Sequence, residues 1–203
     1  MQNCFAIEDL IPVVDPTAYV HPAAVLIGDV IVGPRCYVGP AACLRGDFGR
    51  ITLRDGANVQ DTCVLHGFPD SDTIIDVDGH IGHGAVIHGA YIGPNAMVGM
   101  NAVVMDRSEI GESAIIGAMA FVREGTMIPP RSLALGVPAR VVRQLTDQEI
   151  AWKRNGTREY QNLAVRSLAT QRAVEPLSAM QPNRPRFQGG SSVTLGAIKA
   201  AIK

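Results

Sequence analysis

Aliphatic residues recur at every sixth position along two long stretches of the chain. The first run comprises Val14, Val20, Leu26, Val32, Val38 and Leu44, and the second comprises Ile92, Val98, Val104, Ile110, Ile116, Val122 and Ile128. A helix repeats about every 3.6 residues and an alternating strand every 2, so neither sustains a period of six. A short strand followed by a turn does, and three such units close one triangular coil of about 18 residues. The pattern therefore predicts a parallel β-helix.

The residues between the aliphatic positions favour the same fold. The residue four places later is usually small, as at Cys36, and glycine often follows directly, as at Gly33. Glycine suits a tight turn because it has no Cβ. Continuing the period through the interrupted region requires a strand near residues 51–53 and a loop between residues 65 and 81. We expect about seven coils over residues 11–140.

A different pattern begins after the repeats. The capping box Thr-x-x-Glu that begins at Thr146 predicts a helix to about residue 169. We expect this helix to cover the open end of the β-helix or to pack on a neighbouring chain. The chain after the helix is rich in proline, glycine and serine and is expected to be extended or loose. The predicted domains are a β-helix over 1–145, a helical segment over 146–174 and a tail over 175–203.

The repeat register places two histidines in one column. Arg45, His66 and His88 each directly follow an aliphatic residue of the third face, so they stack one per coil about 4.7–4.9 Å apart. This spacing suits His66 and His88 as two ligands of one metal ion. His83 leaves from the second face and reaches only the pair of an adjacent chain. A three-histidine site therefore predicts that two chains share it, and a trimer with three such sites would satisfy every copy by closed symmetry.

The remaining polar residues and the composition narrow the functional classes. His21 and His80 are expected to be solvated, and Cys36 and Cys63 take inward positions as packing residues. The net charge is −1 and 18% of the residues are charged, which gives no basic field for nucleic acid or a membrane surface. The chain shows no secretion signal, no apolar run near the roughly 20 residues of a membrane span and no C-x-x-C pair. These features favour a cytoplasmic protein.

The repeat pattern resembles the left-handed β-helix of the hexapeptide-repeat superfamily, and the turn Gly136-Val-Pro-Ala-Arg140 is similar to a terminal turn of that group. Within it, Arg45-Gly-Asp47, Asn58-Val-Gln60, His66 and His83-x4-His88 resemble the signature of γ-class carbonic anhydrases. That resemblance implies that His66 and His88 of one chain and His83 of the next bind zinc, or another divalent metal such as iron, cobalt or magnesium. It implies an interface ion pair between Arg45 and Asp47. It also implies that Asn58 and Gln60 line the site and orient a water molecule.

A closer resemblance covers nearly the whole chain. The segments Arg45-Gly-Asp-Phe-Gly-Arg50, His66-Gly-Phe-Pro69, Asp78-Gly-His-Ile-Gly-His83 and Ala151-Trp-Lys153 are similar to the family that comprises the phenylacetic acid degradation protein PaaY and the carnitine operon protein CaiE. The PaaY branch implies a metal-dependent thioesterase that hydrolyses phenylacetyl-type coenzyme A esters. The CaiE branch implies an accessory role beside carnitine–coenzyme A enzymes. The sequence leaves both branches open.

The candidate residues are compatible with thioester hydrolysis. A three-histidine zinc site lowers the pKa of a bound water to about 7 and polarises a carbonyl group. No G-x-S-x-G motif is present or needed. We therefore expect a homotrimeric thioesterase with an acyl-coenzyme A substrate, acting in phenylacetate catabolism. The alternatives are a γ-class carbonic anhydrase, a CaiE-like accessory protein and a hexapeptide acyltransferase. Phe48 stands where the strongest carbonic anhydrases of the class carry a glutamate, which argues against efficient carbon dioxide hydration.

Overall fold

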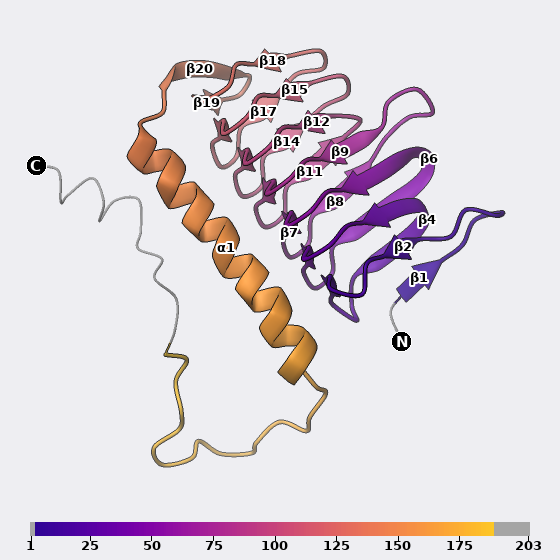
Figure 1. The fold of residues 1–203 in the computed structure, drawn as a ribbon, viewed down its shortest axis with the longest axis vertical. Helices are drawn as coiled ribbons and strands as arrows, with labels where there is room; N and C mark the ends of the chain where they lie inside the picture. Colours follow the sequence, from indigo (N-terminus) through magenta and orange to yellow (C-terminus); the bar gives the residue numbers. More distant parts are fainter. Residues whose placement is uncertain (1–2, 189–203) are drawn as a thin grey trace, which may run out of the picture.

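The computed structural model describes residues 3–188 and contains a stack of triangular coils with one long helix beside it (Figure 1). One sheet of twelve strands comprises β1 (Asn3–Phe5), β2 (Val13–Val14), β4 (Val25–Val32), β6 (Cys43–Leu53), β8 (Val64–His66), β9 (Thr73–Ile75), β11 (Val86–His88), β12 (Tyr91–Ile92), β14 (Val103–Val104), β15 (Glu109–Ile110), β17 (Phe121–Val122) and β18 (Met127–Ile128). A second sheet of eight strands comprises β3 (Tyr19–Val20), β5 (Tyr37–Val38), β7 (Asn58–Val59), β10 (His80–Ile81), β13 (Met97–Val98), β16 (Ile115–Ile116), β19 (Ser132–Gly136) and β20 (Ala139–Gln144). Neighbouring strands are parallel except β19 and β20, which form a terminal antiparallel pair.

The strand pairing confirms the six-residue register. On the third face, Leu44 pairs with Leu26 and Leu65, and Ile87 continues the same row. The strand expected near residues 51–53 is the end of β6, where Leu53 pairs with Val32. The second sheet supplies seven parallel strands, one for each coil. The structure is therefore the left-handed β-helix of hexapeptide repeats, followed by a C-terminal helix, that the sequence predicts.

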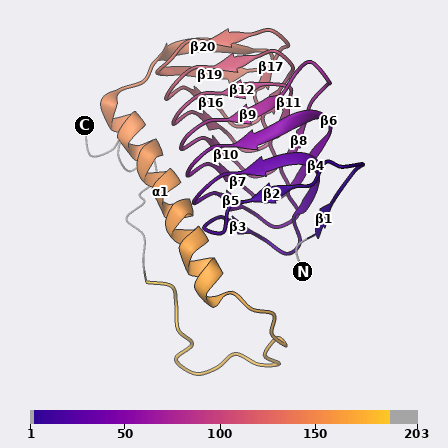
Figure 2. The ribbon, with the colours of Figure 1, turned by 45° about the vertical axis from the view of Figure 1, so that its right-hand side comes forward.

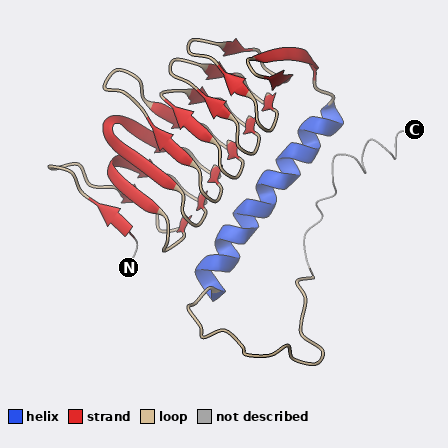
Figure 3. Cartoon of the chain, turned by 180° about the vertical axis from the view of Figure 1, so that it is seen from behind, coloured by secondary structure: helices blue, strands red, loops and turns tan. Residues whose placement is uncertain are grey.

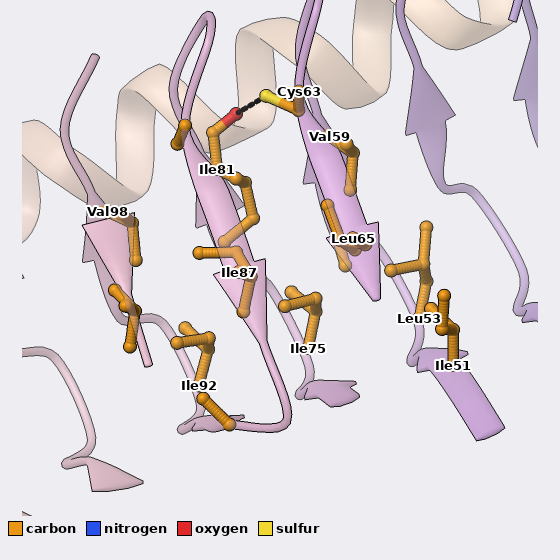
Figure 4. Close-up of a cluster of buried hydrophobic side chains, with 14 of the residues drawn as sticks. Ile51, Leu53, Val59, Cys63, Leu65, Ile75, Ile81, Ile87, Ile92 and Val98 are labelled. Atoms are coloured by element: carbon orange, nitrogen blue, oxygen red, sulfur yellow. Dashed lines mark hydrogen bonds between the residues drawn. The ribbon is translucent and has the colours of Figure 1, made fainter. Parts of the chain in front are cut away.

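The core is a set of aliphatic rows inside the triangle (Figure 4). Leu65, Ile81 and Ile87 are fully buried, and each lies above the equivalent residue of the preceding coil. Cys63 takes an inward corner position, where its thiol donates to the carbonyl oxygen of Gly82 at 3.2 Å. Burial raises the pKa of the Cys63 thiol to about 11, so the group stays protonated. The expected packing role of the inward cysteines is confirmed.

Helix α1 (Asp147–Thr170) begins at the predicted capping box. The Thr146 hydroxyl accepts from the backbone N–H of Glu149 at 3.2 Å, and the Glu149 carboxylate accepts from the Thr146 N–H at 3.0 Å. The helix lies along the side of the stack, beside β3, β5 and β7, and leaves the open end uncovered (Figures 2 and 3). The first of the two expectations, that it covers the open end, is wrong, because outward-facing Tyr19 and Tyr37 give the helix an apolar surface along this side. Packing of the helix on a neighbouring chain stays a prediction.

The segment after the helix contains neither helix nor strand over residues 171–188. The rest of the expected tail, residues 189–203, lies outside the described residues. Within the described part of the chain, no helix is long and apolar enough to cross a membrane.

Candidate metal centre

His66 and His88 lie side by side on adjacent coils. They end strands β8 and β11 and pair directly in the sheet register, with ring centroids 5.0 Å apart. The Nδ1 atom of His66 lies 3.0 Å from the Nε2 atom of His88. Two nitrogens bound to one tetrahedral zinc ion at 2.0–2.1 Å are about 3.3 Å apart. The pair therefore needs only a small movement to hold such an ion.

A carboxylate holds the other nitrogen of each ring. Asp47 Oδ1 lies 3.0 Å from His66 Nε2, and Asp106 Oδ1 lies 2.7 Å from His88 Nδ1. Metal-binding histidines usually donate their second N–H to such a partner, which fixes the ring and its tautomer. Both carboxylates thus leave the facing nitrogens, His66 Nδ1 and His88 Nε2, as the ring atoms that could bind a metal. Sequence reasoning missed Asp106, although it lies one coil beyond His88, where a search for carboxylates near the column could have found it.

The Arg45-Gly-Asp47 segment places an ion pair beside these two histidines. Arg45 Nη1 lies 2.5 Å from Asp47 Oδ2 within the same chain. Burial alone raises the pKa of Asp47, but the hydrogen bonds of Arg45 and His66 outweigh it and hold that pKa below its usual range. Gly46 is required by the close approach of the preceding coil, because a Cβ there would lie 2.4 Å from the Asp29 carbonyl oxygen.

His83 lies at a different corner of the triangle from the His66/His88 pair. It follows β10 in the second sheet, its Nδ1 lies 2.8 Å from Asp61 Oδ2, and its Nε2 lies 3.4 Å from the Tyr160 hydroxyl. Among the described residues of one chain, no group of three histidine, cysteine or acidic side chains could hold a metal. A third ligand from a neighbouring chain stays a prediction.

Asn58 and Gln60 lie on the His83 side of the molecule and contact His80. Gln60 Nε2 lies 2.7 Å from His80 Nε2, and Asn58 Nδ2 lies 3.2 Å from His80 Nδ1. The expectation that His80 is solvated is wrong, since it is only 8% exposed and also contacts Thr157 of helix α1. Burial lowers the pKa of His80 to about 3, so its ring is neutral. The register could not reveal this, because the helix that buries His80 lies outside the repeat.

Two phenylalanine rings flank the histidine pair. The Phe48 ring centroid lies 5.7 Å from His66, and the Phe68 centroid lies 5.0 Å from His88. Their side chains are 59% and 49% exposed. The open side of the pair is therefore rimmed by apolar surface.

Comparison with known proteins identifies the family. The chain is 54% identical over 190 residues to the carnitine operon protein CaiE of Escherichia coli K12, covering 94% of this chain and 97% of CaiE. The chain belongs to the CaiE family. CaiE of Salmonella agona is likewise 54% identical, over 93% of this chain and 96% of that protein. The 54% sequence identity to CaiE confirms the family resemblance drawn from the sequence motifs. It supports the carnitine branch of that family.

The fold of this CaiE family member also matches solved structures and a repeat model. A Bacillus cereus protein named as a candidate acetyltransferase has a TM-score of 0.82 and 32% identity, covering 83% of this chain and 98% of its own. A hexapeptide transferase family protein from Anaplasma phagocytophilum has a TM-score of 0.77 and 32% identity, covering 80% of this chain and 96% of its own. The bacterial transferase hexapeptide model matches residues 89–124. The hexapeptide repeats are thus confirmed by sequence and by fold.

Proposed function

We propose that this protein serves carnitine metabolism by hydrolysing acyl-coenzyme A thioesters at a metal centre shared between chains of a homotrimer. The similarity to the carnitine operon protein CaiE supports the carnitine role. The observation that carries the chemistry is the His66/His88 pair, whose facing nitrogens lie 3.0 Å apart while a carboxylate holds the far side of each ring. Thioesterase action on phenylacetyl-type esters was the expectation from sequence, and the CaiE relatives favour carnitine-related esters in its place.

The reaction is the addition of water to the thioester carbonyl. The new C–O bond forms, the C–S bond breaks, and the products are a carboxylic acid and the coenzyme A thiol. A bound divalent cation supplies Lewis acidity to the carbonyl and activates the water. His66 and His88 would hold this cation, and Asp47 and Asp106 keep the two rings oriented. His83 of the neighbouring chain would complete the three-histidine set, with its Nδ1 fixed by the carboxylate of Asp61.

Gln60 is suited to orient the attacking water. Its amide nitrogen already contacts Asn58 Oδ1 at 3.0 Å and His80 Nε2 at 2.7 Å. The neutral His80 ring can accept from this nitrogen, so the Gln60 carbonyl oxygen is left to accept a hydrogen bond from water. Asn58 thereby acts through Gln60 as a positioning residue.

The apolar rim argues for an acyl group rather than carbon dioxide. Phe48 and Phe68 stand beside the histidine pair, and by the family resemblance Phe48 takes the place of a glutamate that handles protons in rapid carbon dioxide hydration. An apolar surface of this kind contacts an acyl chain favourably. A second candidate is acyl transfer to an acceptor hydroxyl in place of water, and the transferase names of the two similar structures favour it.

The test is coenzyme A release by the full-length protein from a panel of acyl-coenzyme A esters. Zinc-loaded and chelator-treated protein are compared, with and without carnitine as an acceptor, and carbon dioxide hydration is measured in parallel. We expect metal-dependent release by the wild type, loss in His83→Ala, and no change in His21→Ala, a matched histidine of the first coils. Release that requires carnitine would support transfer. No release from any ester by zinc-loaded protein would refute hydrolysis.

The shared site has its own test. A His83→Ala chain keeps the His66/His88 pair, and a His66→Ala chain keeps His83. Mixed trimers therefore contain some intact composite sites. Partial recovery of zinc binding and activity after unfolding and refolding the two variants together supports sharing. Full zinc binding by His83→Ala alone would refute it.

A further inference from the structure

Helix α1 and the second sheet line a partly open cavity of about 210 Å³ next to the candidate site. Its walls include Gln60 and His83, which belong to that site, and the four side chains or backbone segments Met97, Met100, Trp152 and Gly156. His80, Lys153 and Tyr160 also line it, so the cavity has polar groups beside the site residues and an apolar part formed by Met97, Met100 and Trp152. Binding sites for small molecules commonly have this composition, with a few polar groups that fix orientation.

The lysine in the wall does not make the cavity a site for an anion. The Lys153 ammonium donates to the backbone carbonyl of Asp78 at 2.6 Å and to Asn95 Oδ1 at 3.0 Å. Its side chain is 3% exposed. Since its hydrogen bonds are already made to protein, an apolar ligand is the better match for the cavity.

Gly156 gives the decisive observation. It lies inside helix α1, where glycine is unfavourable compared with alanine because it loses more backbone freedom on folding. Neither a positive φ nor a close neighbour requires it, since an added Cβ would meet nothing within 4 Å. The fold therefore does not need glycine at this position. What the glycine does provide is room in the cavity wall.

We propose that this cavity is the binding site for the acyl chain of the substrate and that Gly156 sets the length of chain it accepts. The assignment rests on the proposed thioester chemistry, because Gln60 and His83 at one end mark where the carbonyl group would lie. At about 30 Å³ for each water-sized group, the cavity holds about seven such groups. This volume suits a short apolar acyl chain of about six carbons and is smaller than the pockets that hold drug-sized ligands.

The chain offers a direct probe of the cavity. Trp152 is the only tryptophan of the sequence and lies in the cavity wall. Its fluorescence can report ligand binding without any turnover. The ligands are S-ethyl-coenzyme A and S-hexyl-coenzyme A, thioethers that cannot be hydrolysed and that differ only in chain length.

The variants are Gly156→Leu, which adds a bulky side chain at the cavity wall, and Gly156→Ala, which adds a single methyl group into open space. We expect S-hexyl-coenzyme A to shift Trp152 emission in the wild type and in Gly156→Ala. In Gly156→Leu its affinity should fall by at least about tenfold, as when methylenes are excluded from an apolar pocket, while S-ethyl-coenzyme A binds as before. Circular dichroism verifies that both variants are folded, and Gly156→Val replaces Gly156→Leu if the latter is not.

The outcomes separate this proposal from the proposed function. If no thioester is hydrolysed but Gly156→Leu selectively loses the hexyl ligand, hydrolysis fails and the acyl cavity stands. If thioesters are hydrolysed but Gly156→Leu keeps the wild-type preference for chain length, the cavity assignment is overturned. Binding of S-hexyl-coenzyme A by calorimetry without any change in Trp152 emission also overturns it.

Discussion

Replacing Lys153 by methionine tests how strongly burial disfavours the protonated form of this one side chain. Lys153 lies on the inner face of helix α1 with 3% of its surface exposed. Burial lowers the pKa of its ammonium to about 7, and nearby Asp78 only partly opposes this effect. Protonated Lys153 therefore destabilises the fold at neutral and acidic pH, and Lys153→Met removes this cost. The variant also loses two hydrogen bonds and leaves their acceptors unpaired, at about 1–3 kcal/mol each.

The size and sign of the effect follow from the two pKa values. An unfolded lysine titrates near 10.5, so burial lowers the pKa of Lys153 by about 3.5, which corresponds to about 5 kcal/mol between the protonation states. Between pH 7 and pH 10 the unfolded chain binds more protons than the folded chain. The free energy of unfolding therefore rises with pH in this window, by about 2 kcal/mol from pH 7 to pH 9. Lys153→Met should lack this rise.

The assay is urea unfolding of wild type and variant at pH 7, 8 and 9, at one fixed protein concentration because assembly also affects stability. Arg158→Met removes an exposed cation from the same helix and serves as the control, which should keep the wild-type pH dependence. Only the difference between the curves is interpreted, because other groups titrate in both proteins. Equal pH dependence in Lys153→Met and wild type would refute the argument that burial suppresses the charge.

Three further substitutions have defined outcomes. Glu149→Gln should destabilise the protein at pH 7 but much less at pH 3. The hydrogen bonds from Arg143 lower the pKa of Glu149 to about 2. The ionised carboxylate therefore stabilises the fold fully above about pH 4.5, and this stabilisation disappears as the pH falls through 2. Equal losses in urea titrations at both pH values would contradict this. Asp106→Asn should weaken zinc binding by about 10–100-fold in chelator competition, because His88 loses the carboxylate that orients it; an unchanged affinity would remove Asp106 from the site. Gly46→Ala should lower the free energy of unfolding by about 2 kcal/mol or more in urea titrations, since its Cβ would overlap the preceding coil.

The interior of the molecule could be predicted almost completely from the sequence. Inward residues such as Leu44, Leu65 and Ile87 must be aliphatic at every coil, so the period directly reports the strand register. The same register predicts that His66 and His88 lie together. Each directly follows an inward aliphatic residue, so both side chains leave the coil in the same direction. Both results depend only on the repeat itself.

The exterior was harder to predict, because its environment depends on what packs over each face. His80 has the sequence context of an exposed histidine, yet helix α1 covers it and makes it neutral. The helix position itself follows from Tyr19 and Tyr37, which the period does not distinguish from other outward residues. The carboxylate partners Asp61 and Asp106 were also missed as orienting groups, since each lies in a turn where the six-residue pattern sets no side-chain direction.

The position of helix α1 has a consequence for how the protein unfolds. In a solenoid each coil contacts only its neighbours, so terminal coils can melt while the middle stays folded. Here the helix contacts Tyr19 in the first coils at one end and packs with Ile115 near the other. Melting of an outer coil therefore also loosens a helix on which the central coils depend. The helix couples distant coils into one cooperative unit, and the coils that carry His66 and His88 open only when that unit opens.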